Sequence, residues 1–383
     1  MDELQNTFDA PSQANESVIV NPIEETGQTT LGTSPQAQKS ARRGMRLLKR
    51  FVGLVVVAVI LVLLGIDIAQ SWNTLANYHW QVSVPLLVLA FAGFVAQTLS
   101  YPLIWRSILR RLGQRLSLPK SVRIYLASEF VRYIPGNVWH VLTRILWVER
   151  EGVPKSIGFI SMMVELVTKI AGAALIFAVT LLFWPHIEAV GQVFGGHSAL
   201  LIGIVGIVAL LALLQPRLLN WCLARGLKLL RKPPITVPLR YRDVLAVTLW
   251  WCVSWMIGGL AFYLLFLGIA GTGAAGGIGP ALLTLALCIG IYALGWDIGF
   301  LSFITPSGLG FREAAIILLL GLAAVTPTVA LATVIAFLSR ILTTLAELLC
   351  VSGAHIIVTR LGRSADKSTK AAEEQPVVNA LTD

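Results

Sequence analysis

Lysine and arginine are missing from three stretches of this 383-residue chain, residues 70–82, 185–197 and 269–279. Long apolar runs separate each of these stretches from segments rich in basic residues. Because positive charge gathers on the cytoplasmic side of a polytopic membrane protein, this alternation predicts a chain that crosses a membrane several times. The basic residues concentrate in five segments, with six in 39–50, six in 106–123, three in 144–155, seven in 217–242 and four in 360–370.

Charged residues are scarce overall, at 13% of the chain, whereas 56% of the residues are hydrophobic. The mean hydropathy of +0.76 is typical of a protein whose solvent is mostly lipid. The pI of about 9.7 would also fit a protein that binds nucleic acid. Here the basic residues lie in short loops beside apolar runs, so we expect attraction to anionic lipid headgroups and no nucleic-acid partner.

Cysteine is also scarce, and motifs for cofactors or covalent chemistry are missing. The four cysteines form no CxxC pair, so neither a disulfide frame nor a metal site is indicated. The chain contains no nucleophile triad, no zinc-ligand spacing and no Walker A loop, which excludes an ATP-driven pump within this chain. We therefore expect no cofactor and no metal, and we do not predict an enzyme.

Eight apolar runs approach the length of about 20 residues that a membrane span requires. The shortest, 313–326, would rise roughly 21 Å as a helix. Counting it as a crossing keeps the basic C-terminal segment on the side of the other basic loops. We therefore predict an all-α protein with eight spans in the cytoplasmic (inner) membrane and both termini in the cytoplasm. The runs are 51–69, 83–105, 157–184, 198–215, 243–268, 281–303, 313–326 and 328–353.

Polar segments flank this transmembrane region, which we place at 46–360. Residues 1–45 begin with a stretch rich in Ser, Thr, Gln, Asn and Pro and poor in large apolar groups. Such composition cannot bury enough apolar surface to fold, so it predicts a disordered cytoplasmic tail. We predict a second disordered tail over 361–383.

Two breaks that contain Pro and Gly interrupt the apolar sequence. Residues 124–143 carry Pro135-Gly136 in their middle, and basic loops on both sides predict that this segment dips into the bilayer and returns or lies in the interface. The second break is residues 305–310. Each break follows two spans and precedes two, which predicts two four-span halves, 51–215 and 243–353. Paired breaks point to a central binding site, although tight turns at the membrane surface also explain them.

Several charged residues fall within the spans, where a charge is costly and usually functional. Glu165 and Lys169 lie four residues apart in the third span, so they share one helix face. They would form either a structural clamp or part of a polar pathway. Asp297 in the sixth span needs a cation such as Arg312 or Arg340, or else a proton.

Arg312 and Glu313 begin the seventh span directly after the second break. The free N–H groups and the dipole of a helix N-terminus favour an anion, and a guanidinium recognises phosphate in bidentate fashion. Alternatively, Glu313 complements the dipole and Arg312 anchors to headgroups. Arg132 and Arg144 offer a second phosphate contact near the first break. We predict a substrate site formed by Arg132, Pro135, Gly136, Arg144, Glu165, Lys169, Asp297, Pro306, Gly308, Gly310, Arg312, Glu313 and Arg340.

Both breaks carry a family resemblance. Residues 130–138 (FVRYIPGNV), followed by Arg144 and 151–153, resemble the first signature of the lysylphosphatidylglycerol synthase transmembrane (flippase-like) family. Residues 306–315 (PSGLGFREAA) resemble its second signature. Glu165 matches a family glutamate that is often followed four residues later by aspartate, where this chain has lysine. The resemblance covers roughly 50–355 without the soluble synthase domain, and it implies handling or movement of a lipid rather than its synthesis.

Three functions are compatible with these features, and transport is favoured. An anionic lipid or a polyprenyl-phosphate-linked headgroup would enter between the halves, with Arg312 and either Arg132 or Arg144 holding its phosphate. A membrane-embedded transferase would instead use Glu165 or Asp297 as a base. A non-transporting scaffold would dock a separate lipid-modifying enzyme through its basic loops. The expected partners are membrane lipids and a lipid-linked glycan or phosphate headgroup.

Overall fold

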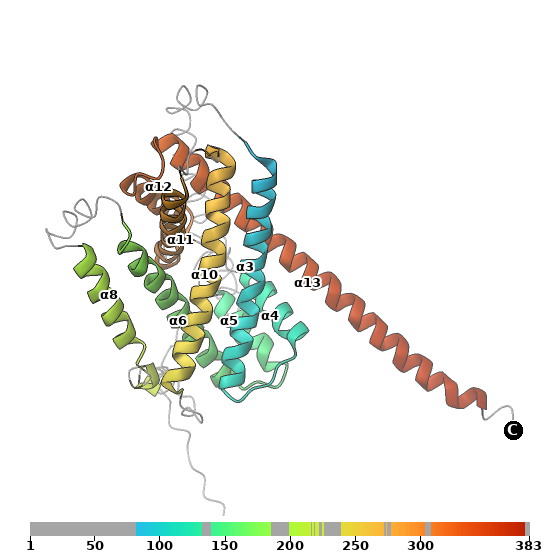
Figure 1. The fold of residues 1–383 in the computed structure, drawn as a ribbon. Helices are drawn as coiled ribbons and strands as arrows, with labels where there is room; N and C mark the ends of the chain where they lie inside the picture. The colour runs from blue at the N-terminus through green and yellow to red at the C-terminus, as the bar shows by residue number, and fades with distance from the viewer. Residues whose placement is uncertain are drawn as a thin grey trace, which may run out of the picture. The chain divides into compact units, whose positions relative to one another are not determined.

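The computed structural model describes residues 82–131, 139–184, 199–215, 217, 219–221, 224–225, 239–271, 273, 277–302 and 308–379. Its elements within these residues are α-helices (Figure 1), so the predicted all-α class is confirmed. The helices are α3 (Val84–Arg111), α4 (Leu118–Phe130), α5 (Trp139–Glu149), α6 (Lys155–Leu181), α8 (Ala199–Leu213), α10 (Tyr241–Ala270), α11 (Ile278–Leu301), α12 (Phe311–Leu322) and α13 (Val329–Asn379).

Five stretches of helix are long and apolar enough to cross a membrane. They are α3, α6, α10, α11 and the Val329–Ala354 part of α13, each between 24 and 30 residues long, against a requirement of about 20. The chain is therefore a multi-pass helical membrane protein. Among the other predicted spans, 51–69 lies outside the described residues, α8 has 15 residues and α12 has 12. The count of eight spans stays a prediction.

Helices from the two predicted halves pack directly on one another. α3 lies alongside α10 (Figure 1), α6 packs on α10 and α11, and α13 packs on α3 and α4. Small residues allow the close approach: a Cβ added to Gly93 on α3 would lie 2.7 Å from the Cβ of Ala261 on α10. Membrane helices use small residues in this way because van der Waals packing, rather than the hydrophobic effect, holds them together.

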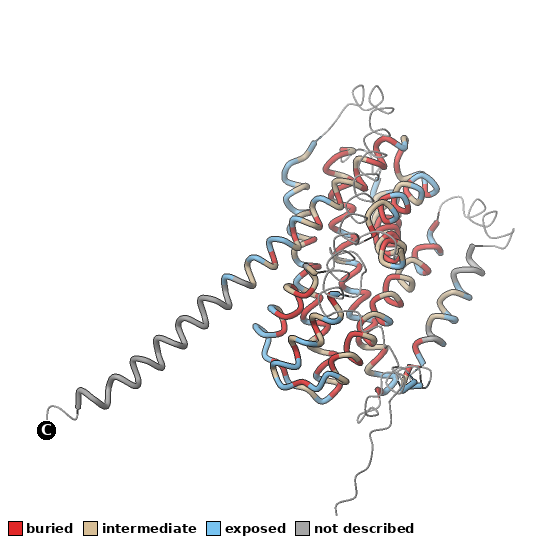
Figure 2. Tube along the Cα trace, turned by 180° about the vertical axis from the view of Figure 1, so that it is seen from behind, coloured by how far each residue is buried: buried red, intermediate tan, exposed pale blue. Residues whose placement is uncertain are grey.

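Aromatic side chains fill the centre of the packed helices. Trp105, Trp251 and Trp255 are fully buried, and Trp255 lies 5.1 Å from Trp296 between ring centroids. Figure 2 shows the buried residues along the inward sides of the helices and exposed ones along their outer sides. The outer sides carry large apolar residues such as Leu249, which is 52% exposed. Helices that are apolar on both sides suit a lipid environment.

Two short helices flank the first break. α4 ends at Phe130 and α5 begins at Trp139, and the two pack against each other. α4 also contacts α3 and α13, while α5 contacts α6. Residues 132–138 between them lie outside the described part of the chain. The two helices that flank the break, α4 and α5, therefore both pack against membrane-spanning helices.

Glycine is required at the second break for its backbone conformation. Gly308 and Gly310 have φ angles of +69° and +88°, in the left-handed region that glycine adopts readily and other residues rarely. Gly308 also lies directly against the backbone of Gly299 on α11, where a side chain would not fit. This turn returns the chain so that α12 packs on α11.

The C-terminal segment continues α13, and its predicted disorder over 361–383 stays a prediction. α13 continues through it as far as Asn379. Residues 364–375 (SADKSTKAAEEQ) contain several Ala, Lys and Glu residues, which are strong helix formers. A helix already nucleated in the membrane span extends through such residues at little cost, because propagation is easier than nucleation.

Candidate functional site

Arg144 on α5 is completely buried, and each of its side-chain nitrogens is bonded to protein. Nε donates to Ser128 Oγ at 2.8 Å, Nη1 donates to Glu165 Oε2 at 2.7 Å, and Nη2 donates to Glu129 Oε1. The guanidinium carbon lies 3.7 Å from the centroid of the Tyr125 ring. A buried charge is tolerated when it is paired and hydrogen-bonded, and this environment satisfies both conditions.

Glu165 connects the two helices of the first break to α6. Its Oε1 accepts a hydrogen bond from the Tyr125 hydroxyl at 2.6 Å, while its Oε2 accepts from Arg144. Tyr125 lies on α4 and Arg144 on α5, so one carboxylate joins three helices. Because each side-chain nitrogen of Arg144 has a protein partner, we assign this residue to positioning the break, and its predicted contact with phosphate stays a prediction.

Lys169 lies one helical turn beyond Glu165 on α6, and aromatic rings enclose its ammonium. Nζ is 4.1 Å from the centroid of Trp296, 4.3 Å from that of Tyr101 and 5.0 Å from that of Trp251. A cation within about 6 Å of a ring face is attracted to it. The rings belong to α11, α3 and α10. Through Lys169, α6 therefore contacts three other helices.

Asp297 follows Trp296 on α11 and is only 3% exposed. Burial opposes a negative charge on Asp297, and the Lys169 ammonium only partly offsets this cost; sequence spacing did not suggest this partner. Its Oδ1 has no hydrogen-bond partner among the residues that the structure describes. A buried carboxyl oxygen without a partner can form a hydrogen bond with a ligand.

The start of α12 holds a second group of buried charges. The backbone N–H of Gly310 donates to Glu313 Oε2 at 2.7 Å, and Glu313 Oε1 lies 3.9 Å from Arg340 Nε on α13. Glu313 is thus both a cap for α12 and the partner of a neighbouring helix. This arrangement combines the dipole role predicted for Glu313 with an interhelical contact.

Arg312 is also buried, with 5% of its surface exposed. Its guanidinium carbon lies 5.2 Å from the centroid of Tyr292, whose hydroxyl donates to Gln97 Oε1 at 2.9 Å. Within the described part of the chain, Arg312 Nε and Nη2 and Gln97 Nε2 are buried without a hydrogen-bond partner. Unpaired donor nitrogens on α3 and α12 thus both lie close to Tyr292 on α11.

A small cleft of about 10 Å³ between α3, α4 and α13 lies beside the first group of charges, with room for about one water molecule. Glu129, the partner of Arg144, and Glu347 on α13 both line it. Tyr101 lines the cleft as well and forms one wall around Lys169. Polar and aromatic side chains thus extend from the first break to α13.

Some of the predicted site residues are not described by the structure. Four of the predicted site residues, Arg132, Pro135, Gly136 and Pro306, lie outside the described residues. The aromatic rings around Lys169 were not predicted, because they come from three separate helices and each tryptophan alone indicates only packing. No group of three His, Cys, Asp or Glu that could hold a metal occurs in the described ranges.

The protein is a polytopic α-helical membrane protein with an internal polar centre. This class is defined by its membrane-spanning helices, by the charged side chains buried between them and by the glycine-dependent break. The family model for the lysylphosphatidylglycerol synthase TM region matches residues 50–349. The chain belongs to this family, which confirms the resemblance carried by residues 130–138 and 306–315. Searches of curated proteins and of solved structures found no match.

Proposed function

We propose that this protein binds an anionic lipid, or a polyprenyl-phosphate-linked headgroup, at Arg312 and moves it across the cytoplasmic membrane. The observation that carries the proposal is the buried guanidinium of Arg312, whose Nε and Nη2 lack hydrogen-bond partners among the described residues. Leaving a buried donor unsatisfied costs about 1–3 kcal/mol. A phosphate group supplies two oxygens in the geometry that these two nitrogens match.

The other buried charges support a route rather than an isolated site. Asp297 and Lys169 are electrostatically coupled, and Lys169 is one helical turn from Glu165 in the first group of charges. Ionisable residues within membrane spans commonly line substrate or ion pathways. A headgroup leaving Arg312 would therefore meet further polar partners on α11 and α6.

The positioning contacts fit a mechanism in which parts of the bundle move. Arg144 and Glu165 lock the first break to α6, while Glu313 fixes the start of α12 beside Gly310. In transporters with paired broken helices, substrate sites lie at these breaks, and the halves rock around them. In our proposal the lipid is not altered covalently, and both termini and the basic loops face the cytoplasm.

Reconstitution into liposomes tests this function. Purified protein would be incorporated with tail-labelled anionic or zwitterionic lipids, and exchange between leaflets would be followed with a membrane-impermeant quencher. We expect exchange of anionic lipid above that of protein-free vesicles, and its loss in Arg312→Gln. Absence of exchange by folded wild type contradicts the proposal. A chemically altered lipid in extracts of these vesicles would favour the transferase instead.

A further inference from the structure

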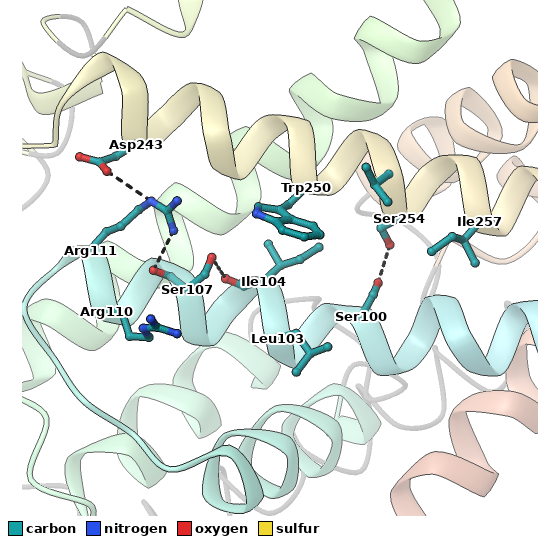
Figure 3. A pocket seen from close by; sticks show the side chains of 11 residues that line it. Ser100, Leu103, Ile104, Ser107, Arg110, Arg111, Asp243, Trp250, Ser254 and Ile257 are labelled. Atoms are coloured by element: carbon teal, nitrogen blue, oxygen red, sulfur yellow. Dashed lines mark hydrogen bonds and ion pairs between the residues drawn. The ribbon is translucent and has the colours of Figure 1, made fainter.

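A groove on the outer surface of the helices runs between α3 and α10. It encloses about 660 Å³, within the size range of about 300–1,000 Å³ that small-molecule pockets occupy. Figure 3 shows Arg111, Trp250 and Ser254 following one another along it. Apolar side chains, among them Leu103 and Val253, line most of its length. The groove is therefore shaped and lined for a long apolar group.

Basic residues lie at one end of this groove. A second pocket, of about 560 Å³, adjoins it there and is lined by Arg106, Arg110 and Arg115 without an acidic residue. Arg110 lines both spaces. In the groove itself Asp243 lies 3.3 Å from Arg111 Nε, so that carboxylate is already engaged. The end of the groove thus carries an excess of positive charge beside an apolar channel.

Local structure positions the arginines of the second pocket. Arg106 and Arg110 are four residues apart on α3 and share a helix face. Arg106 Nε donates to the carbonyl oxygen of Leu116 at 2.8 Å, which holds the loop after α3 against the helix. Arg115 belongs to that loop, so the hydrogen bond keeps the third arginine beside the other two. The fold therefore fixes Arg106 and the loop after α3, and the exposed Arg110 and Arg115 lie beside them.

The length of the groove matches one leaflet of a bilayer. Ser100 and Arg111, both lining it, are eleven residues apart, which corresponds to about 16 Å along a helix. Half of a hydrocarbon core of about 30 Å is similar. The basic residues lie in segment 106–123, which the charge pattern assigns to the cytoplasmic side. Anionic lipids are enriched in that leaflet and attract juxtamembrane arginine.

We propose that the groove and the pocket of three arginines together form a docking site for one anionic glycerophospholipid of the cytoplasmic leaflet. Its phosphate lies among Arg106, Arg110 and Arg115, and one acyl chain follows the groove past Trp250. This site is separate from the buried charges, because Lys169 contacts Trp251 on a buried face of α10, whereas Trp250 is 56% exposed. The site does not depend on translocation.

Lipid retention tests the headgroup half of the site. Wild type and Arg110→Gln/Arg115→Gln would be placed in phosphatidylcholine nanodiscs containing increasing phosphatidylglycerol, and retained lipid would be counted by native mass spectrometry. Two lost contacts of about 1 kcal/mol each predict roughly 10- to 30-fold weaker retention. Lys120→Gln/Arg123→Gln removes the same charge from the same segment but spares the pocket, so we expect wild-type retention. Equal retention by all three proteins, each shown to be folded, overturns the proposal.

A photocrosslinking residue tests what occupies the groove. Leu103 lines the groove and is 50% exposed, so a benzoylphenylalanine there would react with its occupant in native membranes. A mass increase equal to phosphatidylglycerol supports the proposal. Crosslinks to residues 51–69 of the same chain, or to a second copy, would overturn it. Because neither readout involves leaflet exchange, failure of translocation and failure of this site are distinguishable.

Discussion

Arg144 Nη1 donates to Glu165 Oε2 at 2.7 Å, and this hydrogen bond ties the helix after the first break to the middle of a membrane-spanning helix. The two residues come from α5 and α6 and are both buried. Arg144 and Arg312, both buried cations, differ in how many of their side-chain nitrogens have protein partners. Each side-chain nitrogen of Arg144 is bonded to a protein partner, whereas Arg312 Nε and Nη2 lack partners among the described residues.

Removing the Arg144 cation should destabilise the protein strongly. Arg144→Gln leaves the Glu129 and Glu165 carboxylates buried without their common partner, and breaking a buried pair in this way costs about 3–5 kcal/mol. We expect a clear fall in the midpoint of thermal unfolding in detergent. The matched control is Lys155→Gln, which removes a half-exposed cation. An unfolding midpoint for Arg144→Gln equal to that of the control would contradict the assigned positioning role.

Loss of the Tyr125 hydroxyl should have a smaller effect. Tyr125→Phe removes the donor to Glu165 Oε1 but keeps the ring beneath the Arg144 guanidinium. A hydrogen bond to a charged group contributes about 1.5–3 kcal/mol. We predict a lower denaturation midpoint than for wild type, yet a higher one than for Arg144→Gln. The reverse order of the two variants would show that the Tyr125 hydroxyl, rather than the ion pair, governs stability here.

Lys169 and Asp297 should be energetically coupled. Each single change, Lys169→Met or Asp297→Asn, removes one member of this pair, in which the Lys169 charge favours the ionised Asp297 against the cost of burial, whereas the double change removes both. We expect the double variant to be more stable than the sum of the single effects predicts, by about 1 kcal/mol or more. Unfolding measurements on the four proteins form a double-mutant cycle. Additive effects would mean that the two charges do not stabilise each other.

Gly308 should tolerate no side chain. Its φ of +69° costs a residue with a Cβ about 1–2 kcal/mol, and the backbone of Gly299 occupies the space that a Cβ would need. Gly308→Ala should therefore lower both stability and leaflet exchange. Gly353→Ala is the control, because that helical position is open and alanine favours a helix by about 1 kcal/mol. Similar behaviour of the two variants would contradict the role of this turn.

Much of the architecture follows from local sequence features. Apolar runs predict helices through the bilayer, and α3, α6, α10 and α11 confirm them. Gly308 and Gly310 predict a break, because glycine readily adopts the left-handed backbone conformation. The structure shows that conformation at both residues. Glu165, Lys169 and Arg312 attract attention because charges within spans are rare. All of this information is contained in short segments of the chain.

The partners of these charges could not be predicted, because they come from other helices. Helical spacing places Glu165 and Lys169 on one face, but it says nothing of Arg144 or Tyr125, which complete the Glu165 site. The rings around Lys169 lie on three further helices. Similarly, no local pattern indicates that an apolar groove begins beside Arg106 and Arg110, since the groove forms only where α3 meets α10.

The central claim, that Arg312 holds the phosphate of a moving headgroup, is tested most directly by its conservative replacement. Arg312→Lys keeps the positive charge but loses the planar fork that binds two oxygens. We predict that the initial rate of anionic-lipid exchange in proteoliposomes falls roughly 10-fold or more, as loss of one bidentate charge-assisted contact implies. Lys120→Gln should exchange lipid at the wild-type rate. Wild-type exchange by folded Arg312→Lys and Arg312→Gln would contradict the account.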